Sequence, residues 1–484
     1  FRFMVKKINL LPLLLLLTIS GFSQQHHAPK REFRGVWIAS VANIDWPSKP
    51  GLASEEQQQE FLTILKMHKA NGMNAVVVQI RPAADAFYPS PHEPWSAWLT
   101  GKSGRPPQPY YDPLLFMIEE SHKQGLEFHA WFNPYRGIVN VDTARIDSAS
   151  VAFQHREWFV KYDKNLYFNP GLPEARKHVT NVILDVVNRY NVDGIHFDDY
   201  FYPYKVAKLN FPDSTTFLKY GNEFTSIDDW RRNNVNQLIK NISDSIRKVK
   251  PFVQFGISPF GVWRNQDKDP AGSATQAGQT CFDDLYADVR EWMKEGWIDY
   301  VTPQIYWSIG FEKANYNVIA RWWNDNSFGK RVYIGQATYR INGNNPDTRW
   351  KEANQLPNQL RLNRSLKNIH GSVYFSSKSF IPNPLGINDS LRSNFYRHPA
   401  LSPTWKDSTF ANHYPLSFTT DAKSIILQWK ETDSYNDLSA HARYIIYRFN
   451  AGEKIDLSNP KNILAVVADT NPKATKTHRY KDNS

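Results

Sequence analysis

The chain has 484 residues, a formal net charge of +11 and 14% aromatic residues, and this length allows one large domain plus a smaller one. Lysine and arginine are spread along the chain without a long basic run, so the charge does not indicate a nucleic-acid partner, and attraction to an anionic cell envelope is its simpler use. The single cysteine, Cys281, excludes an intramolecular disulfide, and we expect it to be a small buried apolar residue.

Residues 1–23 predict a signal peptide. Lys6 and Lys7 give a positive start, residues 10–17 give an apolar core that is short for a membrane span, and residues 20–23 give an exit rich in small residues. No cysteine near this exit could carry a lipid anchor. We therefore expect an exported, monomeric protein, periplasmic or extracellular, that is not an integral membrane protein.

Residues 31–400 alternate between strand-like and helix-like segments. Short apolar runs predict strands, and segments with helical periodicity separate them. The predicted strands are 35–38, 75–80, 128–132, 194–197, 253–257, 300–305, 332–335 and 372–375. The predicted helices are 55–70, 113–124, 173–190, 227–248, 283–295, 315–324, 348–366 and 388–395. Strict alternation of eight strands with helices predicts a (β/α)8 TIM barrel of the α/β class.

The fourth predicted strand runs directly into two adjacent carboxylates, Asp198 and Asp199. Because side chains alternate along a strand, His196 and Asp198 share one face, which in a parallel barrel points inward and places Asp198 at the mouth, where the strands end. Barrel enzymes hold their catalytic groups at that end. Either Asp could instead cap the following segment, but the aromatic residues just after the pair favour a site.

Other predicted strands also finish on inward-facing polar groups. Arg81 follows the second strand, Asn133 the third, and Gln304 lies on the sixth. Polar groups that converge at one end of an apolar barrel predict a binding site, although each alone could be a satisfied structural hydrogen bonder.

Residues 404–484 show short alternating strands without helices, as in 424–429 and 444–449. The pattern predicts a fibronectin type III-like β-sandwich with Trp429 in its core. About eighty residues follow Pro403, so we expect the sandwich to be incomplete. A β-appendage particular to this barrel is the alternative.

The barrel resembles the glycosyl hydrolase-like 10 family of exported bacterial proteins. The resemblance covers most of residues 34–399 and is carried by 34–38, 79–82 with 85–88, 93–96, 131–136, 193–203, 256–261 and 303–307. It implies a glycoside hydrolase that cleaves peptidoglycan glycan strands stripped of their stem peptides.

The fourth strand is also similar to its counterparts in two other barrel hydrolase groups. Asp198 matches the nucleophile of the α-amylase type, although His196 stands where an arginine would be. In the chitinase type a Glu acid follows the matching Asp by two residues, and here that position is Tyr200. The nucleophile or base is therefore nominated, and the proton donor is not.

Glycoside hydrolysis normally uses one ionised and one protonated carboxyl group. We assign Asp198 as the ionised member. Asp199 and Glu93 are the first candidates for the acid, and Asp85 follows them. Glu93 lies among prolines and tryptophans, where loss of water would raise its pKa, or it is a solvated loop charge.

The other polar and aromatic residues near the predicted mouth form the expected substrate-binding set. Guanidinium and amide groups would hold hydroxyls or an acidic substituent, and aromatic rings would stack on sugar faces. The set is Arg81, Asp85, His129, Trp131, Asn133, Arg136, His196, Tyr202, Gln304, Tyr306 and Trp307.

Three rival classes compete with this assignment. A metal-dependent hydrolase could use His129, His196 and the Asp pair, but no His-x-His or His-x-x-x-His spacing supports it. A serine hydrolase lacks a Gly-x-Ser-x-Gly elbow at 256–261. A glycan-binding barrel without catalysis is the serious alternative because the acid is unassigned. We expect a polysaccharide partner, no metal and no cofactor.

Overall fold

The computed structural model describes residues 28–140, 148–403, 416–421, 424–430, 443–468 and 477–482. The predicted signal peptide lies outside the described residues. Within the described ranges, no helix has both the length and the apolar character needed to cross a membrane.

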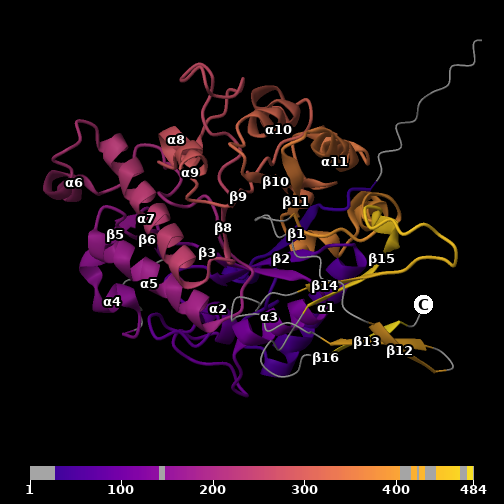
Figure 1. Ribbon diagram of the computed structural model, residues 1–484. Helices are drawn as coiled ribbons and strands as arrows, with labels where there is room; N and C mark the ends of the chain where they lie inside the picture. Colours follow the sequence, from indigo (N-terminus) through magenta and orange to yellow (C-terminus); the bar gives the residue numbers. More distant parts are fainter. Residues whose placement is uncertain are drawn as a thin grey trace, which may run out of the picture.

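Eight strands build the centre of the molecule. They are β1 (Phe33–Ile38), β2 (Ala75–Arg81), β3 (Glu127–Phe132), β7 (Gly194–Phe197), β8 (Gln254–Ile257), β9 (Tyr300–Val301), β10 (Arg331–Gln336) and β11 (Ile369–Tyr374). They pair in parallel and close in the order β1-β11-β10-β9-β8-β7-β3-β2, which confirms the predicted TIM barrel (Figure 1). Their near-continuous apolar sequences suit strands that are buried on both faces.

Helices surround this barrel (Figure 1). The longer ones are α1 (Ser54–Ala70), α3 (Pro113–Lys123), α5 (Pro173–Arg189), α7 (Ile227–Val249), α10 (Tyr316–Asp325) and α11 (Gln355–Ser365). The shorter ones are α2 (Ala97–Thr100), α4 (Val151–Gln154), α6 (Ser214–Tyr220), α8 (Cys281–Asp284), α9 (Val289–Lys294) and α12 (Ile387–Ser390). Local sequence sets their starts: the Asp112 side chain caps α3, with Pro113 in the first turn, and Ser226 caps α7.

Three predicted elements are interrupted. The helix predicted at 348–366 begins as a 3-10 turn at Thr348–Lys351, breaks at the extended Glu352 and continues as α11 from Gln355. The helix predicted at 283–295 is split into α8 and α9 because Tyr286 adopts a positive φ of 53° and Asp288 caps a new helix. The strand predicted at 300–305 pairs fully over two residues only, since Pro303 has no N–H to donate, and its path continues as an isolated bridge at Gln304.

Large side chains fill the inside of the barrel. Phe33 stacks on Tyr333 with ring centroids 4.2 Å apart, and Trp37, Trp131 and Tyr300 join the same cluster. A ligand site is therefore expected at the mouth and not within the barrel.

A small antiparallel sheet that the sequence did not reveal follows β3. It consists of β4 (Arg136–Ile138), β5 (Phe159–Tyr162) and β6 (Asn165–Phe168), in the order β4-β6-β5.

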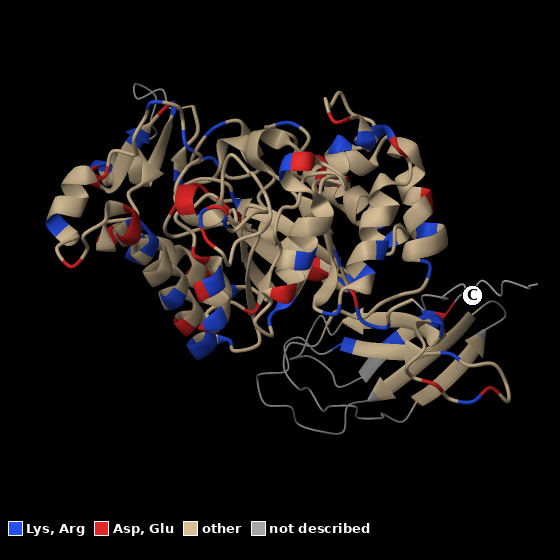
Figure 2. Cartoon of the chain, turned by 90° about the horizontal axis from the view of Figure 1, so that it is seen from above, with Lys and Arg blue, Asp and Glu red and all other residues tan. Residues whose placement is uncertain are grey.

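Cys281 is buried, as expected. Basic and acidic residues are interspersed over the helices (Figure 2).

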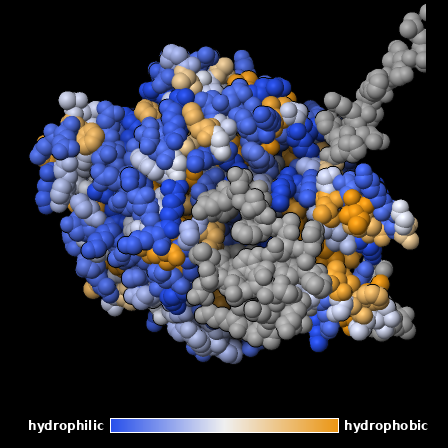
Figure 3. Space-filling model, viewed as in Figure 1, coloured by the Kyte–Doolittle hydropathy of each residue, from blue (hydrophilic) through white to orange (hydrophobic). Residues whose placement is uncertain are grey.

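The C-terminal part forms two further sheets. One contains β12 (Leu416–Asp421), β13 (Ser424–Lys430) and β16 (Thr477–Asp482), and the other contains β14 (Arg443–Tyr447) and β15 (Ile463–Ala468). The buried Trp429 packs on Tyr444 across the two sheets at 5.1 Å, and apolar residues gather over this part in Figure 3. The fibronectin type III assignment and the domain boundaries stay predictions.

The sheet of β14 and β15 contacts the base of the barrel, where the strands begin. Arg443 of β14 donates to Asp193, just before β7, at 2.5 Å, and lies 3.3 Å from Glu127, the first residue of β3. This contact is at the end opposite the mouth.

Candidate active site

Asp198 and Asp199 lie directly after β7, at the mouth. β7 ends at Phe197, so the alternation that would turn the two side chains apart no longer applies. Both residues are buried, with 5% and 2% of their surface exposed. Asp198 contacts the β3 side of the mouth, through Asn133, and Asp199 contacts Tyr204 in its own loop.

A chain of amides fixes one oxygen of Asp198. The backbone N–H groups of Ser40 and Val41 donate to Gln79 Oε1 at 3.0 and 2.9 Å, which turns Gln79 Nε2 toward Asn133 Oδ1 at 2.6 Å. Asn133 Nδ2 must then face Asp198 Oδ2, which it reaches at 2.5 Å. The direction of each amide follows from these donors, since a backbone N–H cannot accept.

Burial sets the protonation of the pair. Burial raises the pKa of Asp198 to about 6, while Arg136 and the Asn133 hydrogen bond oppose the rise. Burial and the neighbouring charge of Asp198 raise the pKa of Asp199 to about 7. Two carboxyl groups that titrate near neutrality, one after the other, can supply an ionised group and a proton donor at the same pH.

Tyr204 is a site residue that the sequence analysis missed. Its hydroxyl donates to Asp199 Oδ2, whereas Asp199 Oδ1 is buried without a hydrogen-bond partner among the described residues. A tyrosine five residues after the Asp pair, within a loop rich in aromatics, was the available signal.

Arg136 supplies a positive charge at the mouth. Its guanidinium lies over the Tyr200 ring at 4.6 Å and donates to the Pro82 carbonyl at 3.1 Å. Arg136 is half-buried and forms no ion pair within the described ranges, so it keeps donors for a substrate. Its predicted binding role stays a prediction.

Glu93 does not have the environment that the sequence predicted. It is buried and forms a two-pronged ion pair with Arg81, at 2.6 and 2.5 Å, and His178 lies 3.2 Å away. Burial disfavours the charged form, but Arg81 and His178 outweigh it and hold the pKa of Glu93 below its usual range. The expected rise in its pKa is therefore wrong, because its partners lie elsewhere in the chain.

The guanidinium of Arg81 is likewise bonded to other groups of the protein. Besides Glu93, it donates to the carbonyl groups of Asn133 and Pro134 and is fully buried. It therefore shapes the loop after β3, and the expectation that it holds substrate hydroxyls is corrected.

The two predicted histidines lie inside the barrel, below the mouth. The Trp37 indole N–H donates to His196 Nε2 at 3.2 Å, so Nδ1–H of His196 donates to the Tyr300 hydroxyl at 3.0 Å. That hydroxyl donates to His129 Nδ1 at 2.9 Å, and His129 Nε2–H faces Glu127 at 3.2 Å. Both rings are fully buried, and burial lowers the pKa of His196 well below its usual value. The expected substrate contacts of His129 and His196 are therefore wrong.

Comparison with known proteins places the chain in a family. The model of the glycosyl hydrolase-like 10 family matches residues 32–352. The chain belongs to this family. Glycosyl hydrolase YngK of Bacillus subtilis (strain 168) is 51% identical over 425 residues, which cover 86% of this chain and 83% of that protein. Glycosyl hydrolase DigH of Escherichia coli (strain K12) is 41% identical over 384 residues, which cover 73% and 84%.

Among solved structures, the glycoside hydrolase domain of PgaB (BpsB) from Bordetella bronchiseptica is 15% identical, with a TM-score of 0.47 over 75% of this chain and 98% of that domain. The family and its named members confirm the resemblance inferred from the sequence and the predicted enzyme class, glycoside hydrolase.

The remaining predicted residues divide into two groups. Tyr202 is 1% exposed and packs between Phe211 and Tyr286, so its predicted stacking on a sugar face is corrected. Half-buried predicted residues near the mouth keep their binding roles as predictions; they are Asp85, Gln304, Tyr306 and Trp307.

Asp85 and the buried Trp131 have informative surroundings. Burial and nearby Glu93 raise the pKa of Asp85 to about 6, although Ser96 opposes the rise. Trp131 packs in the barrel interior, and its indole N–H approaches Asp198 closely enough to lower the pKa of that carboxyl. Among the described residues, no three His, Cys, Asp or Glu side chains converge as a metal site would require.

Proposed function

We propose that this protein is an exported hydrolase of peptidoglycan glycan strands that lack stem peptides. The observation that carries the catalytic part is the buried, adjacent pair Asp198 and Asp199, whose pKa values are raised to about 6 and about 7. The predicted signal peptide and the family membership support the location and the substrate class.

In this proposal Asp198 is ionised and Asp199 is protonated when substrate binds. Asp199 gives its proton to the leaving glycosidic oxygen, and Asp198 acts on the sugar carbon as nucleophile or on water as base. Asn133 holds Asp198 Oδ2 and leaves Oδ1, which accepts only a weak backbone contact from Tyr200 at 3.3 Å, for the reaction. Tyr204 orients Asp199.

Asp85 is the second candidate for the donor, because its carboxyl is half-buried and its pKa is also raised to about 6. Glu93 is no longer a donor candidate in this proposal, since its ion pair with Arg81 keeps it charged.

The test is digestion of purified peptidoglycan. The full chain is incubated with intact sacculi and with sacculi from which an amidase has removed the stem peptides, and products are identified by mass. We expect short glycan fragments from the stripped material and few from the intact material. Cleavage of both substrates at equal rates would refute the substrate preference.

Two controls separate the rival mechanisms. The Asp198→Asn variant should bind the stripped glycan without releasing fragments. A strong chelator should leave the parent reaction unchanged; loss of activity that zinc or manganese restores would instead support a metal-dependent hydrolase.

A further inference from the structure

A cleft of about 520 Å³ opens beside the loop that carries the Asp pair. Its lining comes from three separate parts of the fold: Tyr162 of β5, the loop from Tyr202 to Phe211, and Arg231, Asp284 and Tyr286 from the α7 and α8 side. The volume is within the range of small-molecule sites in proteins. None of these residues except Tyr202 belongs to the site predicted from the sequence.

The floor of the cleft is a packed aromatic cluster. Tyr202 lies between Phe211 and Tyr286, with ring centroids 5.0 and 4.9 Å away, and Tyr162 lies 5.7 Å from Phe211. The Tyr162 hydroxyl also accepts the N–H of Val206 at 2.8 Å, which ties the rim of the cleft to β5. The cleft is therefore built before any ligand binds.

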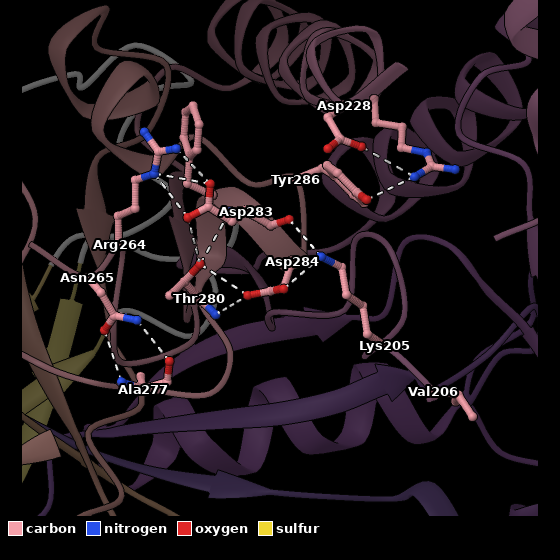
Figure 4. Close-up of polar contacts among 12 residues, drawn as sticks. Lys205, Val206, Asp228, Arg264, Asn265, Ala277, Thr280, Asp283, Asp284 and Tyr286 are labelled. Carbon is pink, nitrogen blue, oxygen red and sulfur yellow. Dashed lines mark hydrogen bonds and ion pairs between the residues drawn. The ribbon is translucent and has the colours of Figure 1, made fainter. Parts of the chain in front are cut away.

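The wall formed by α8 is equally fixed. Lys205 reaches Asp284 at 2.8 Å and the Asp283 carbonyl at 3.1 Å, as Figure 4 shows. In the same view Thr280 holds Asp284 through its backbone N–H at 2.7 Å, and Arg264 holds Asp283 at 2.9 Å.

The charges of the cleft are not balanced. Arg231 is matched by Asp213, at 2.5 and 3.0 Å, and Lys205 is matched by Asp284. Lys208, on the exposed rim, forms no ion pair with any residue that the structure describes. Beside it the apolar side chains of Val206 and Leu209 are 36% and 46% exposed.

We infer that this cleft is a subsite for a carboxylate-bearing sugar of the glycan, with Lys208 as the cation that recognises the carboxylate. The apolar rim would contact the C–H face of the ring, and Asn210 would bond its hydroxyls. The inference rests on the proposed function, because Tyr204 joins the two sites: its hydroxyl bonds Asp199, and its neighbours Pro203 and Lys205 line the cleft.

The experiment uses two probes that differ in one group. One is the tetrasaccharide of N-acetylglucosamine, and the other is the tetrasaccharide in which alternate rings carry a lactyl ether, hence a carboxylate. Binding is measured by calorimetry on the full chain with Asp198→Asn, which does not need turnover. Hydrogen exchange on the same samples reports which backbone amides become protected.

The variants change the charge of the rim alone. Lys208 has a φ of +65°, a conformation that Asn tolerates, so Lys208→Asn removes the charge without new strain, and Lys208→Glu reverses it. The control is Lys66→Glu on α1, another exposed lysine without an ion pair within the described residues.

The parent should bind the acidic probe about fivefold more tightly than the neutral one, as expected for a solvent-accessible charge pair. Lys208→Asn should abolish this preference, Lys208→Glu should reverse it, and Lys66→Glu should keep it. The preference should shrink as salt is added, and protection should fall on residues 203–211.

A preference that survives Lys208→Glu, no protection of residues 203–211, or no binding of either probe would overturn the inference. Failure of the proposed function is distinguishable. If the parent releases no fragments from peptidoglycan but its preference for the acidic probe still depends on Lys208, only the proposed function fails. If fragments appear but the Lys208 variants do not change the preference, only the subsite fails.

Discussion

Asp198 and Asp199 at the mouth of the barrel and Glu127 and Asp193 at its base are two pairs of buried carboxylates whose surroundings are opposite. At the base, Glu127 and Asp193 share Arg443 at 3.3 and 2.5 Å, and His129 and His122 also lie against them. At the mouth, the Asp pair accepts from the neutral groups of Asn133 and Tyr204, and neither carboxylate has an ion pair within the described ranges.

This difference decides which pair can exchange protons. Burial disfavours the charge of Glu127, but Arg443 and His129 outweigh it and lower the pKa of that carboxyl, so it stays ionised. At the mouth the charge of Arg136 only partly opposes burial at Asp198, and burial raises the pKa values of Asp198 and Asp199 to about 6 and about 7. A cation paired directly with a buried carboxylate therefore keeps it ionised, whereas a buried carboxylate without such a pair can gain and lose a proton near neutrality. Glu93 lies near the mouth, but it is paired with Arg81 and therefore resembles the carboxylates at the base.

The largest expected effect is at the mouth. Asp198→Asn should lower kcat about 10³- to 10⁴-fold, because the group that acts at the reacting centre is lost. The release of reducing ends from stripped glycan measures it. The thermal midpoint should not fall, since no ion pair is broken. A variant with activity within tenfold of the parent would contradict the assignment.

Asp199→Asn should lower kcat about 10²-fold and change the pH profile. In the parent, activity should rise with pH as Asp198 ionises near pH 6 and fall as Asp199 loses its proton near pH 7. The amide cannot lose a proton, so the falling limb should disappear while the rising limb stays. Activated aryl glycosides, which need no protonation, should be affected least.

Glu93→Gln is the matched control for this change. It should keep both limbs and instead lower stability, because Arg81 is left buried without its partner. If it removes the falling limb while Asp199→Asn keeps it, Glu93 is the donor after all.

At the base the effect should be on stability and not on catalysis. Arg443→Met should lower the free energy of unfolding by about 3 kcal/mol, because Glu127 and Asp193 lose their cation, and leave kcat unchanged. Since the pKa of Glu127 is held low, its contribution is present above the ordinary Glu value of about 4.3 and is lost as pH falls.

Denaturant titrations at neutral and acidic pH measure this difference. Lys240→Met, which breaks an exposed pair with Asp244 at 2.6 Å, is the control and should cost less than about 1 kcal/mol. An equal cost for both variants would show that the base pair contributes no more than a surface contact.

The sequence predicted the barrel and the position of the Asp pair at its mouth because both are local signals. Alternation along β7 placed Asp198 at the mouth, and the count of strands predicted closure. How deep a residue lies in the barrel cannot be read from the local pattern. The alternation puts His129 and Asn133 on the same side of the chain, but His129 pairs in register with Gly194, four residues before Asp198. His129 therefore lies deep in the barrel. The partners of Glu93 were equally hidden, since Arg81 and His178 meet it only in the fold.

The smallest expected effect tests how the mouth pair is oriented. Gln79 contacts no substrate in the proposal, yet it sets the direction of the Asn133 amide that holds Asp198. In Gln79→Glu the carboxylate still accepts from Ser40 and Val41 but cannot donate to Asn133, so the Asn133 amide should turn its oxygen toward Asp198.

Because the Asn133 hydrogen bond lowers the pKa of Asp198, its loss should move the rising limb of the pH profile to higher pH. We expect kcat to fall about tenfold with KM unchanged, as for a residue that positions a catalytic group without touching substrate. Gln336→Glu is the matched control: Gln336 is also a fully buried glutamine at a strand end, but it bonds Tyr316 and Ser372 and not the Asp pair. Its pH profile should equal that of the parent. If both variants shift the limb alike, or if Gln79→Glu leaves it in place, the amide chain does not control the ionisation of Asp198.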